Sequence, residues 1–172
     1  MAIKLKQVSE QEHLHPGNLA CAACPEMLGF RHVLKVLGPE TIVINGTGCL
    51  AVCTQMAVPK VPHFHVLFEN AAAVISGVDD ALTAMGKRAG VHLLVVAGDG
   101  GTADIGLSAL SGAIERNQDF IYVCFDNESY MNTGGQRSGT TPFGARTSTT
   151  PIGRKTLGED RPPGMRKDLV EI

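Results

Sequence analysis

The stretch "VVAGDGGTADIG", residues 95–106, joins an apolar run to a glycine turn and then to a possible helix start. The run itself, "VHLLVVAG" at 91–98, is typical of a strand buried on both faces of a parallel sheet. Glycine turns of this kind let backbone N–H groups approach phosphate oxygens closely. Asp99, however, lies inside the turn, where its negative charge would repel a phosphate. If the turn binds an anion, another group must therefore offset the repulsion between that anion and the Asp99 carboxylate.

Strand and helix patterns alternate along the chain on both sides of the turn. We expect strands over 41–46, 65–68, 91–98 and 119–127, helices over 26–37, 69–88 and 102–117, an irregular segment within 50–68 and a long loop over 132–153. Thr102 is the expected N-cap of the last helix, with Asp104 in its first turn. Short strand–helix–strand connections predict an α/β fold, with a parallel sheet and helices on both faces.

Composition indicates one globular domain over residues 1–172. Hydrophobic residues make up 44% of the chain, charged residues 19%, and the net charge of −2 offers no basic surface for nucleic acid. The polar start shows no secretory signal, and no apolar run is long enough for a membrane span. We therefore expect a cytoplasmic protein with reduced cysteines. The final residues, "RKDLVEI" at 166–172, resemble a helix just begun, so we expect the sequence to lack the C-terminal part of a larger domain.

A divalent cation accounts for a carboxylate in a phosphate loop. Asp99 and Asn127 each follow a predicted parallel strand, and the carboxyl ends of such strands meet at one edge of the sheet. Mg²⁺ prefers oxygen ligands and bridges protein oxygens to phosphates, with the Ser129 main-chain carbonyl as a candidate third ligand. Two other interpretations remain open at this point. "GDGGTA" also matches a dinucleotide-binding fingerprint, and the turn could be purely structural.

Several longer stretches resemble one enzyme family. "GDG" at 98–100 followed by "DNE" at 126–128 is similar to the thiamine diphosphate motif. Between residues 16 and 153 the chain resembles the β subunits of the 2-oxoacid:ferredoxin oxidoreductases, pyruvate:ferredoxin oxidoreductase in particular, through "CAACPEMLGFRHVLKVLGPETIVINGTGC", "FENAAAVISG" and "FDNESYMNTGGQRSGTTPFGA". The resemblance implies a thiamine diphosphate-binding fold.

The same resemblance implies roles for individual residues. Asp99, Asn127 and the Ser129 carbonyl would hold Mg²⁺, and Asn132 would face the substrate beside the thiazolium ring. The remaining residues implied to lie near the cofactor are Glu26, Gly98, Gly100 and Gly101. For Glu26, a charge in the first turn of a helix is an equally good interpretation.

The cysteines suggest a metal site in the segment 16–53. Cys21 and Cys24 form one closely spaced pair, and Cys49 and Cys53 form another. Spacing alone fits four-thiolate zinc as well as iron–sulfur. The family resemblance implies a [4Fe–4S] cluster on Cys21, Cys24 and Cys49, with a fourth cysteine from sequence beyond this chain. Cys53 and Cys124 are then expected to be thiols without a metal.

The activity implied by the resemblance is oxidative decarboxylation of a 2-oxoacid, pyruvate first, to acetyl-CoA and CO₂. Electrons would pass through the cluster to ferredoxin, and the partners would be α-, γ- and δ-type subunits, ferredoxin, coenzyme A and the substrate. Arg146 departs from the family pattern and leaves oxalate or another charged oxoacid open. Two alternatives from other classes are a thiamine diphosphate-dependent decarboxylase or lyase without an electron acceptor, and a zinc-bearing binding module.

Overall fold

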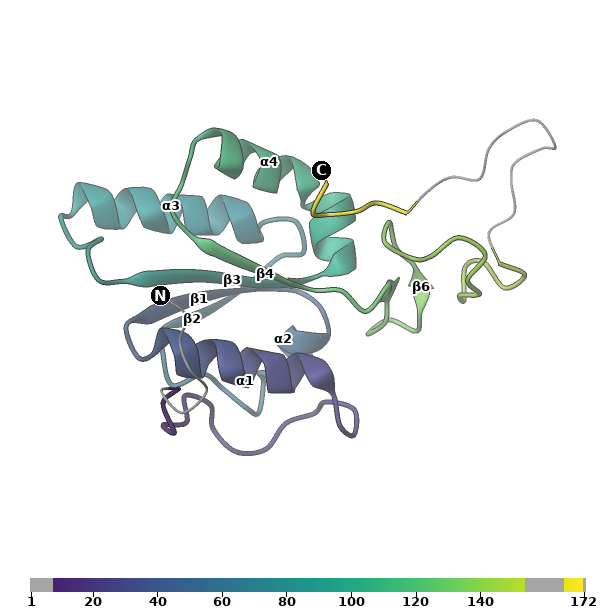
Figure 1. Ribbon diagram of the computed structural model, residues 1–172, viewed down its shortest axis with the longest axis horizontal. Helices are drawn as coiled ribbons and strands as arrows, with labels where there is room; N and C mark the ends of the chain where they lie inside the picture. The colour runs from purple at the N-terminus through teal and green to yellow at the C-terminus, as the bar shows by residue number, and fades with distance from the viewer. Residues whose placement is uncertain (1–7, 154–165, 172) are drawn as a thin grey trace.

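The computed structural model describes residues 8–153 and 166–171 (Figure 1). The helices and strands follow one another in the order α1 (Pro25–Leu37), β1 (Thr41–Gly46), α2 (Cys49–Cys53), β2 (His63–Val66), α3 (Ala71–Ala84), β3 (His92–Gly98), the π-helix η2 (Gly100–Ile105), α4 (Leu107–Glu115), β4 (Ile121–Phe125), β5 (Ser129–Tyr130) and β6 (Gln136–Arg137). Among the described residues, every helix is too short or too polar to span a lipid bilayer.

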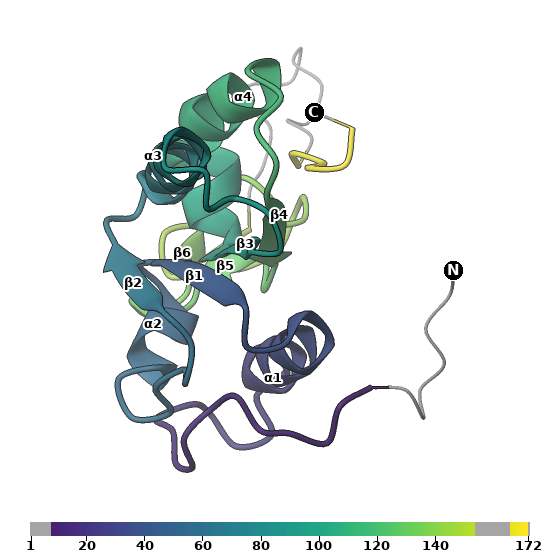
Figure 2. The ribbon, with the colours of Figure 1, turned by 90° about the vertical axis from the view of Figure 1, so that its left-hand side faces the viewer.

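The centre of the molecule is a parallel sheet. Its strands lie in the order β2-β1-β3-β4, and each neighbouring pair is parallel. Helices α3 and α4 cover one face, while α1 and α2 cover the other (Figures 1 and 2). The predicted α/β class, with a parallel sheet between two helical layers, is confirmed.

Side chains alternate between two buried clusters on the two faces of the sheet. Val43 of β1 joins Phe30 and Leu34 of α1 on one face, whereas the next residue, Ile44, joins Ile75 of α3 on the other. Successive side chains of a strand point to opposite faces, so a strand buried on both sides is apolar throughout. The continuous apolar runs in the sequence have this origin.

The order of the strands reverses direction between β1 and β3. From β1 the chain crosses to β2 on one side, and from β2 it returns through α3 to β3 on the other side of β1. The connections that leave β1 and β3 therefore diverge to opposite faces of the sheet, which opens a crevice beyond the carboxyl ends of these strands. In open α/β sheets this is where ligands bind.

The helix expected over 102–117 begins differently from the prediction. Helical backbone starts at Gly100 with the π-helix η2, and α4 follows from Leu107. The Thr102 hydroxyl donates to the Gly98 carbonyl at 2.7 Å and therefore does not cap the helix, so the N-cap prediction is wrong. The cause is the wide π-turn, which extends the helix back into the glycine turn and makes Thr102 an interior residue.

Smaller differences concern element boundaries. The strand expected over 65–68 is β2, two residues earlier, and the segment expected to be irregular contains the short helix α2. The helix expected over 69–88 is shorter, and the loop over 132–153 contains β6, which pairs with β5. At the other end, 169–171 form a turn, and residue 172 lies outside the described residues.

Candidate cofactor-binding site

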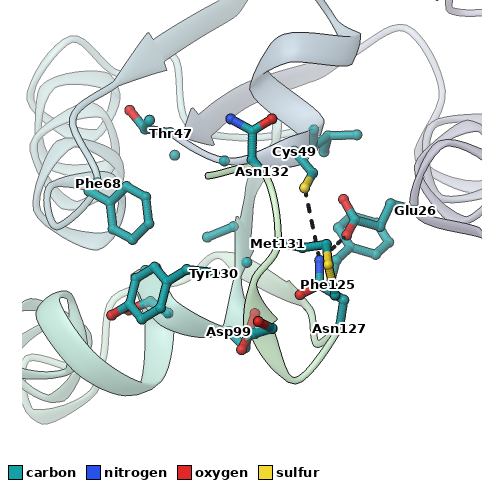
Figure 3. Close-up of a pocket in the computed structure, with 18 of the residues that line it drawn as sticks. Glu26, Thr47, Cys49, Phe68, Asp99, Phe125, Asn127, Tyr130, Met131 and Asn132 are labelled. Atoms are coloured by element: carbon teal, nitrogen blue, oxygen red, sulfur yellow. Dashed lines mark hydrogen bonds between the residues drawn. The ribbon is translucent and has the colours of Figure 1, made fainter. Parts of the chain in front are cut away.

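A pocket opens at the carboxyl ends of the parallel strands, where the strand order reverses (Figure 3). Its walls are residues 46–50 after β1, residues 97–101 after β3, and Phe125, Asn127 and residues 129–133 after β4. Glu26 and Phe68 complete the lining. All eight residues that the sequence suggested for cofactor and substrate line this one pocket: Glu26, Gly98, Asp99, Gly100, Gly101, Asn127, Ser129 and Asn132.

Asp99 lies at the base of the pocket and is almost fully buried, with 2% of its surface exposed. The Thr140 hydroxyl lies 3.0 Å from Asp99 Oδ2 and 2.9 Å from Asp126 Oδ1, but its single hydrogen can serve only one of them. Burial raises the pKa of Asp99, and the nearby Asp126 charge adds to this effect. Within the described residues, Asp99 forms no ion pair. A buried carboxylate in this position is well suited to a cation.

Asn127 supplies a second oxygen. Its amide nitrogen donates to Glu26 Oε1 at 2.7 Å and lies 4.0 Å from Cys49 Sγ. Its Oδ1 is buried and has no hydrogen-bond partner in the part of the chain that the structure describes. A buried, unpartnered amide oxygen is costly unless it meets a donor or a cation. Together with the Asp99 carboxylate, it forms a donor set of the hard oxygen type that Mg²⁺ prefers.

Two glycines of the turn leave room for two aromatic rings. A Cβ at Gly100 would overlap the Tyr130 ring, and one at Gly101 would lie 3.3 Å from the Phe68 carbonyl oxygen. The two rings stack with centroids 5.8 Å apart, and the Tyr130 hydroxyl donates to Asp104 Oδ2 at 2.9 Å. Packing against the Tyr130 ring therefore requires glycine at position 100.

Residues 34–169 match the family model described as thiamine pyrophosphate enzyme, C-terminal TPP binding domain. The chain belongs to this family. The matched range includes the whole sheet, the glycine turn and both candidate oxygen ligands, Asp99 and Asn127. The family match favours a thiamine pyrophosphate-binding domain over a dinucleotide-binding one.

Among similar proteins, a pyruvate synthase subunit PorB of Methanothermobacter thermautotrophicus is 54% identical over 159 residues, covering 91% of this chain and 55% of that protein. A ketoisovalerate oxidoreductase subunit VorB of Pyrococcus furiosus is 46% identical over 173 residues, covering 94% and 53%. The chain thus spans about half the length of these relatives.

The fold also resembles that of a solved structure, a 2-oxoglutarate:ferredoxin oxidoreductase from Magnetococcus marinus with 2-oxoglutarate, coenzyme A and succinyl-CoA bound. The TM-score is 0.68 at 24% identity, over 83% of this chain and 48% of that one. At this identity the likeness concerns the fold.

In this thiamine pyrophosphate-binding domain, the segment after β4 carries two further candidates. The Ser129 side chain is buried and donates to the Gln136 carbonyl at 2.6 Å, while the Ser129 carbonyl accepts from the Met131 N–H at 2.8 Å. A carbonyl oxygen has two lone pairs, so one remains for a cation. Asn132 lies in the pocket wall on the opposite side from Asp99 (Figure 3).

Glu26 and Cys49 form the side of the pocket nearest α1. Burial raises the pKa of Glu26; the hydrogen bond from Asn127 opposes this shift, and the Asp99 charge adds to it. The pKa of the Cys49 thiol is also raised, first by burial and then by Glu26 and the neighbouring thiols Cys24 and Cys21.

The cysteines differ in exposure. Cys21 is exposed, Cys24 and Cys49 are partly buried, and Cys53 is buried. The described residues contain no group of three or more His, Cys, Asp or Glu side chains placed to hold one metal ion. Burial raises the pKa of Cys53 to about 11, which disfavours its thiolate form. The cluster ligands proposed from the sequence remain a prediction.

For other residues of the thiamine pyrophosphate-binding domain, only the tertiary structure shows their place around the pocket. Phe68, Tyr130 and Thr140 lie in stretches that resemble the family, but the sequence assigned them no role. In the structure Phe68 and Tyr130 line the pocket, and the Thr140 hydroxyl lies 3.0 Å from Asp99 Oδ2. The exposed Arg146 lines a separate hollow, which shares Asn127, Ser129 and Met131 with the cofactor pocket.

Cys124 lies in β4 and, with Leu110 and Tyr122, lines an apolar groove beside α4.

Proposed function

We propose that the pocket binds thiamine diphosphate as its magnesium complex. The buried Asp99 carboxylate, the unpartnered Asn127 amide oxygen and the Ser129 carbonyl would hold the cation, and the backbone of the glycine turn would contact the diphosphate. The unpartnered oxygen of Asn127 carries this proposal, because a buried acceptor in the same pocket as a buried carboxylate calls for a positive charge near both.

We further propose that the chain is the cofactor-binding part of a β subunit of a 2-oxoacid:ferredoxin oxidoreductase, with pyruvate as substrate. Its partners would be the α-, γ- and δ-type subunits, coenzyme A and ferredoxin, in the cytoplasm. Support comes from the 54% identity to a pyruvate synthase subunit. When bound, thiamine diphosphate supplies a nucleophilic carbon and accepts the electrons that decarboxylation releases.

The residues of this chain would orient and shield the reacting groups. The stacked Phe68 and Tyr130 rings line the pocket and exclude water from one wall. Asn132, on another wall, would donate a hydrogen bond to the substrate. Cys21, Cys24 and Cys49 would hold a [4Fe–4S] cluster, which would supply one-electron transfer chemistry. Cys49 lines the pocket and lies 4.0 Å from the Asn127 amide nitrogen.

The test combines binding with turnover. Thiamine diphosphate should bind the complex with Mg²⁺ and fail to bind when EDTA removes the cation, as measured by calorimetry. Pyruvate should then reduce ferredoxin only in the presence of coenzyme A. Turnover without any electron acceptor would support a decarboxylase instead. A colourless protein with one bound zinc would contradict the cluster.

Similarity to one relative suggests a second candidate substrate. The ketoisovalerate oxidoreductase subunit is 46% identical over 94% of this chain, so a branched 2-oxoacid is the next candidate. Pyruvate, 2-oxoisovalerate, 2-oxoglutarate and oxalate should be assayed side by side. A preference for an acid with two carboxylates that disappears in Arg146→Ala would point to the hollow beside the pocket.

A further inference from the structure

We propose that Glu26 is a positioning residue for the cation site and acts through Asn127. Its carboxylate holds the Asn127 side chain so that the amide oxygen, and not the amide nitrogen, is available to the cation. The inference rests on the proposed function, since it concerns the same site.

An asparagine amide has two ends of similar shape and opposite chemistry. The oxygen accepts hydrogen bonds and binds cations, whereas the NH₂ group donates two hydrogen bonds and repels cations. An asparagine that is free to rotate by half a turn about its last side-chain bond would present the wrong end part of the time. A cation ligand of this type therefore needs partners that fix the orientation of its amide.

Both acceptors next to Asn127 lie on its nitrogen side. Glu26 Oε1 accepts a hydrogen bond of 2.7 Å, and Cys49 Sγ, a weaker acceptor, lies at 4.0 Å (Figure 3). Turning the amide over would place its oxygen against the ionised Glu26 carboxylate, which offers no hydrogen, and would leave only the weak S–H donor of Cys49 on that side. The present orientation is therefore strongly preferred, and it leaves Oδ1 buried without a partner within the described chain.

Glu26 reaches this place from a distant part of the sequence. Pro25 occupies the first turn of α1, and Glu26 follows it in the same turn, 101 residues before Asn127. Helix α1 is anchored under the sheet by the fully buried Phe30 and Leu34. The carboxylate is thus held by a rigid element, as an orienting group requires.

The experiment measures cation binding directly. Mn²⁺ binding with thiamine diphosphate is followed by the loss of the free-ion EPR signal, on the assembled complex after removal of its own cation and cofactor. Glu26→Leu should weaken Mn²⁺ binding by about 10- to 100-fold, as expected on losing an outer-shell partner. Glu26→Gln should recover part of this loss, because the glutamine oxygen can accept the same hydrogen bond, while its NH₂ group would also tolerate the turned amide.

Two controls separate orientation from a general structural role. Glu115→Leu makes the same change at an exposed end of α4 and should leave Mn²⁺ binding unchanged. In an Asn127→Ala background, Glu26→Leu should have almost no further effect, because its partner is gone. Thermal unfolding of each variant checks that it is folded.

The outcomes distinguish this inference from the proposed function. Equal losses in Glu26→Leu and Glu26→Gln, or additive losses in the double variant, would overturn the role of Glu26 while leaving the cation site intact. If neither Asp99→Ala nor Asn127→Ala weakens Mn²⁺ binding, the cation site itself is wrong, and the role of Glu26 falls with it.

Discussion

The two candidate ligand sets of this protein are built in different ways. The cation cradle, which we define as Asp99, Asn127 and the Ser129 carbonyl, sits just past the ends of β3 and β4, and Asp99 is 2% exposed. The cysteine loop, residues 16–24, precedes α1 outside the sheet, and Cys21 is exposed. Backbone hydrogen bonds of the sheet fix the positions of the first set, whereas an irregular segment carries two thiols of the second.

This contrast has a consequence for binding. Ligands at strand ends are already in place, so a cation there gains its full interaction energy without ordering the chain. Ligands on an irregular segment come together when the metal binds, and part of the binding energy is used to order them. We therefore expect changes in the cradle and in the loop to have separable effects.

The largest expected effect is on the cradle. Asp99→Ala removes the only charge in the cradle and should weaken thiamine diphosphate binding by on the order of 100-fold, even at high Mg²⁺. Calorimetry on the complex measures it. Asp80→Ala, at an exposed position of α3, is the matched control and should bind normally. Unchanged thiamine diphosphate binding in Asp99→Ala would show that the cradle does not hold the cation.

The second prediction concerns the loop. Cys21→Ser should cause loss of most of the iron and of the visible absorption, because serine is a poor ligand for iron–sulfur clusters. Thiamine diphosphate binding should change little, since Cys21 does not line the pocket. Cys53→Ser, a change at a buried thiol, should retain the iron. Loss of cofactor binding in Cys21→Ser would mean that the two sites form one unit.

The third prediction tests how rigid the pocket wall is. Gly100→Ala would push a methyl group into the Tyr130 ring, which is held by Phe68 and by its hydrogen bond to Asp104. We expect the free energy of unfolding to fall by about 1–3 kcal/mol, as for other overpacked sites. Gly98→Ala is the control, since nothing lies within 4 Å of a Cβ there. Urea unfolding curves of equal midpoint would show that the ring moves freely.

The smallest expected effect concerns the attachment of the segment before the cysteine loop. Glu12 forms ion pairs with Arg31 and Lys35 of α1, and their hydrogen bonds lower its pKa to about 2. A carboxyl whose pKa is lower in the folded state stabilises that state above its unfolded pKa, 4.5 here, and loses this contribution as the pH falls toward 2.

Glu12→Gln should therefore lower the melting temperature slightly at pH 7. The difference from the parent should shrink as the pH falls below 4.5. The effect is small because the pair is exposed and screened by solvent. A difference that grows at low pH would contradict the sign of the shift.

The sequence predicted the sheet because its strands are apolar on both faces. It also predicted that Asp99 and Asn127 come together, since both follow parallel strands that end at the same edge. It failed at Thr102, where side-chain propensity suggested a cap but the π-helix extends further back. Local preference was outweighed there by the geometry of the glycine turn.

The sequence by itself thus determined the layered fold and the glycine turn, and it placed the two candidate oxygen ligands at one edge of the sheet, because these features depend on hydrophobic pattern and on spacing along the chain. Only the tertiary structure decided which way the Asn127 amide faces. That orientation depends on Glu26, 101 residues away, and on Cys49, which α2 brings to the same wall of the pocket. Contacts between residues so distant in the sequence leave no local pattern, and they form only when the helices pack on the sheet.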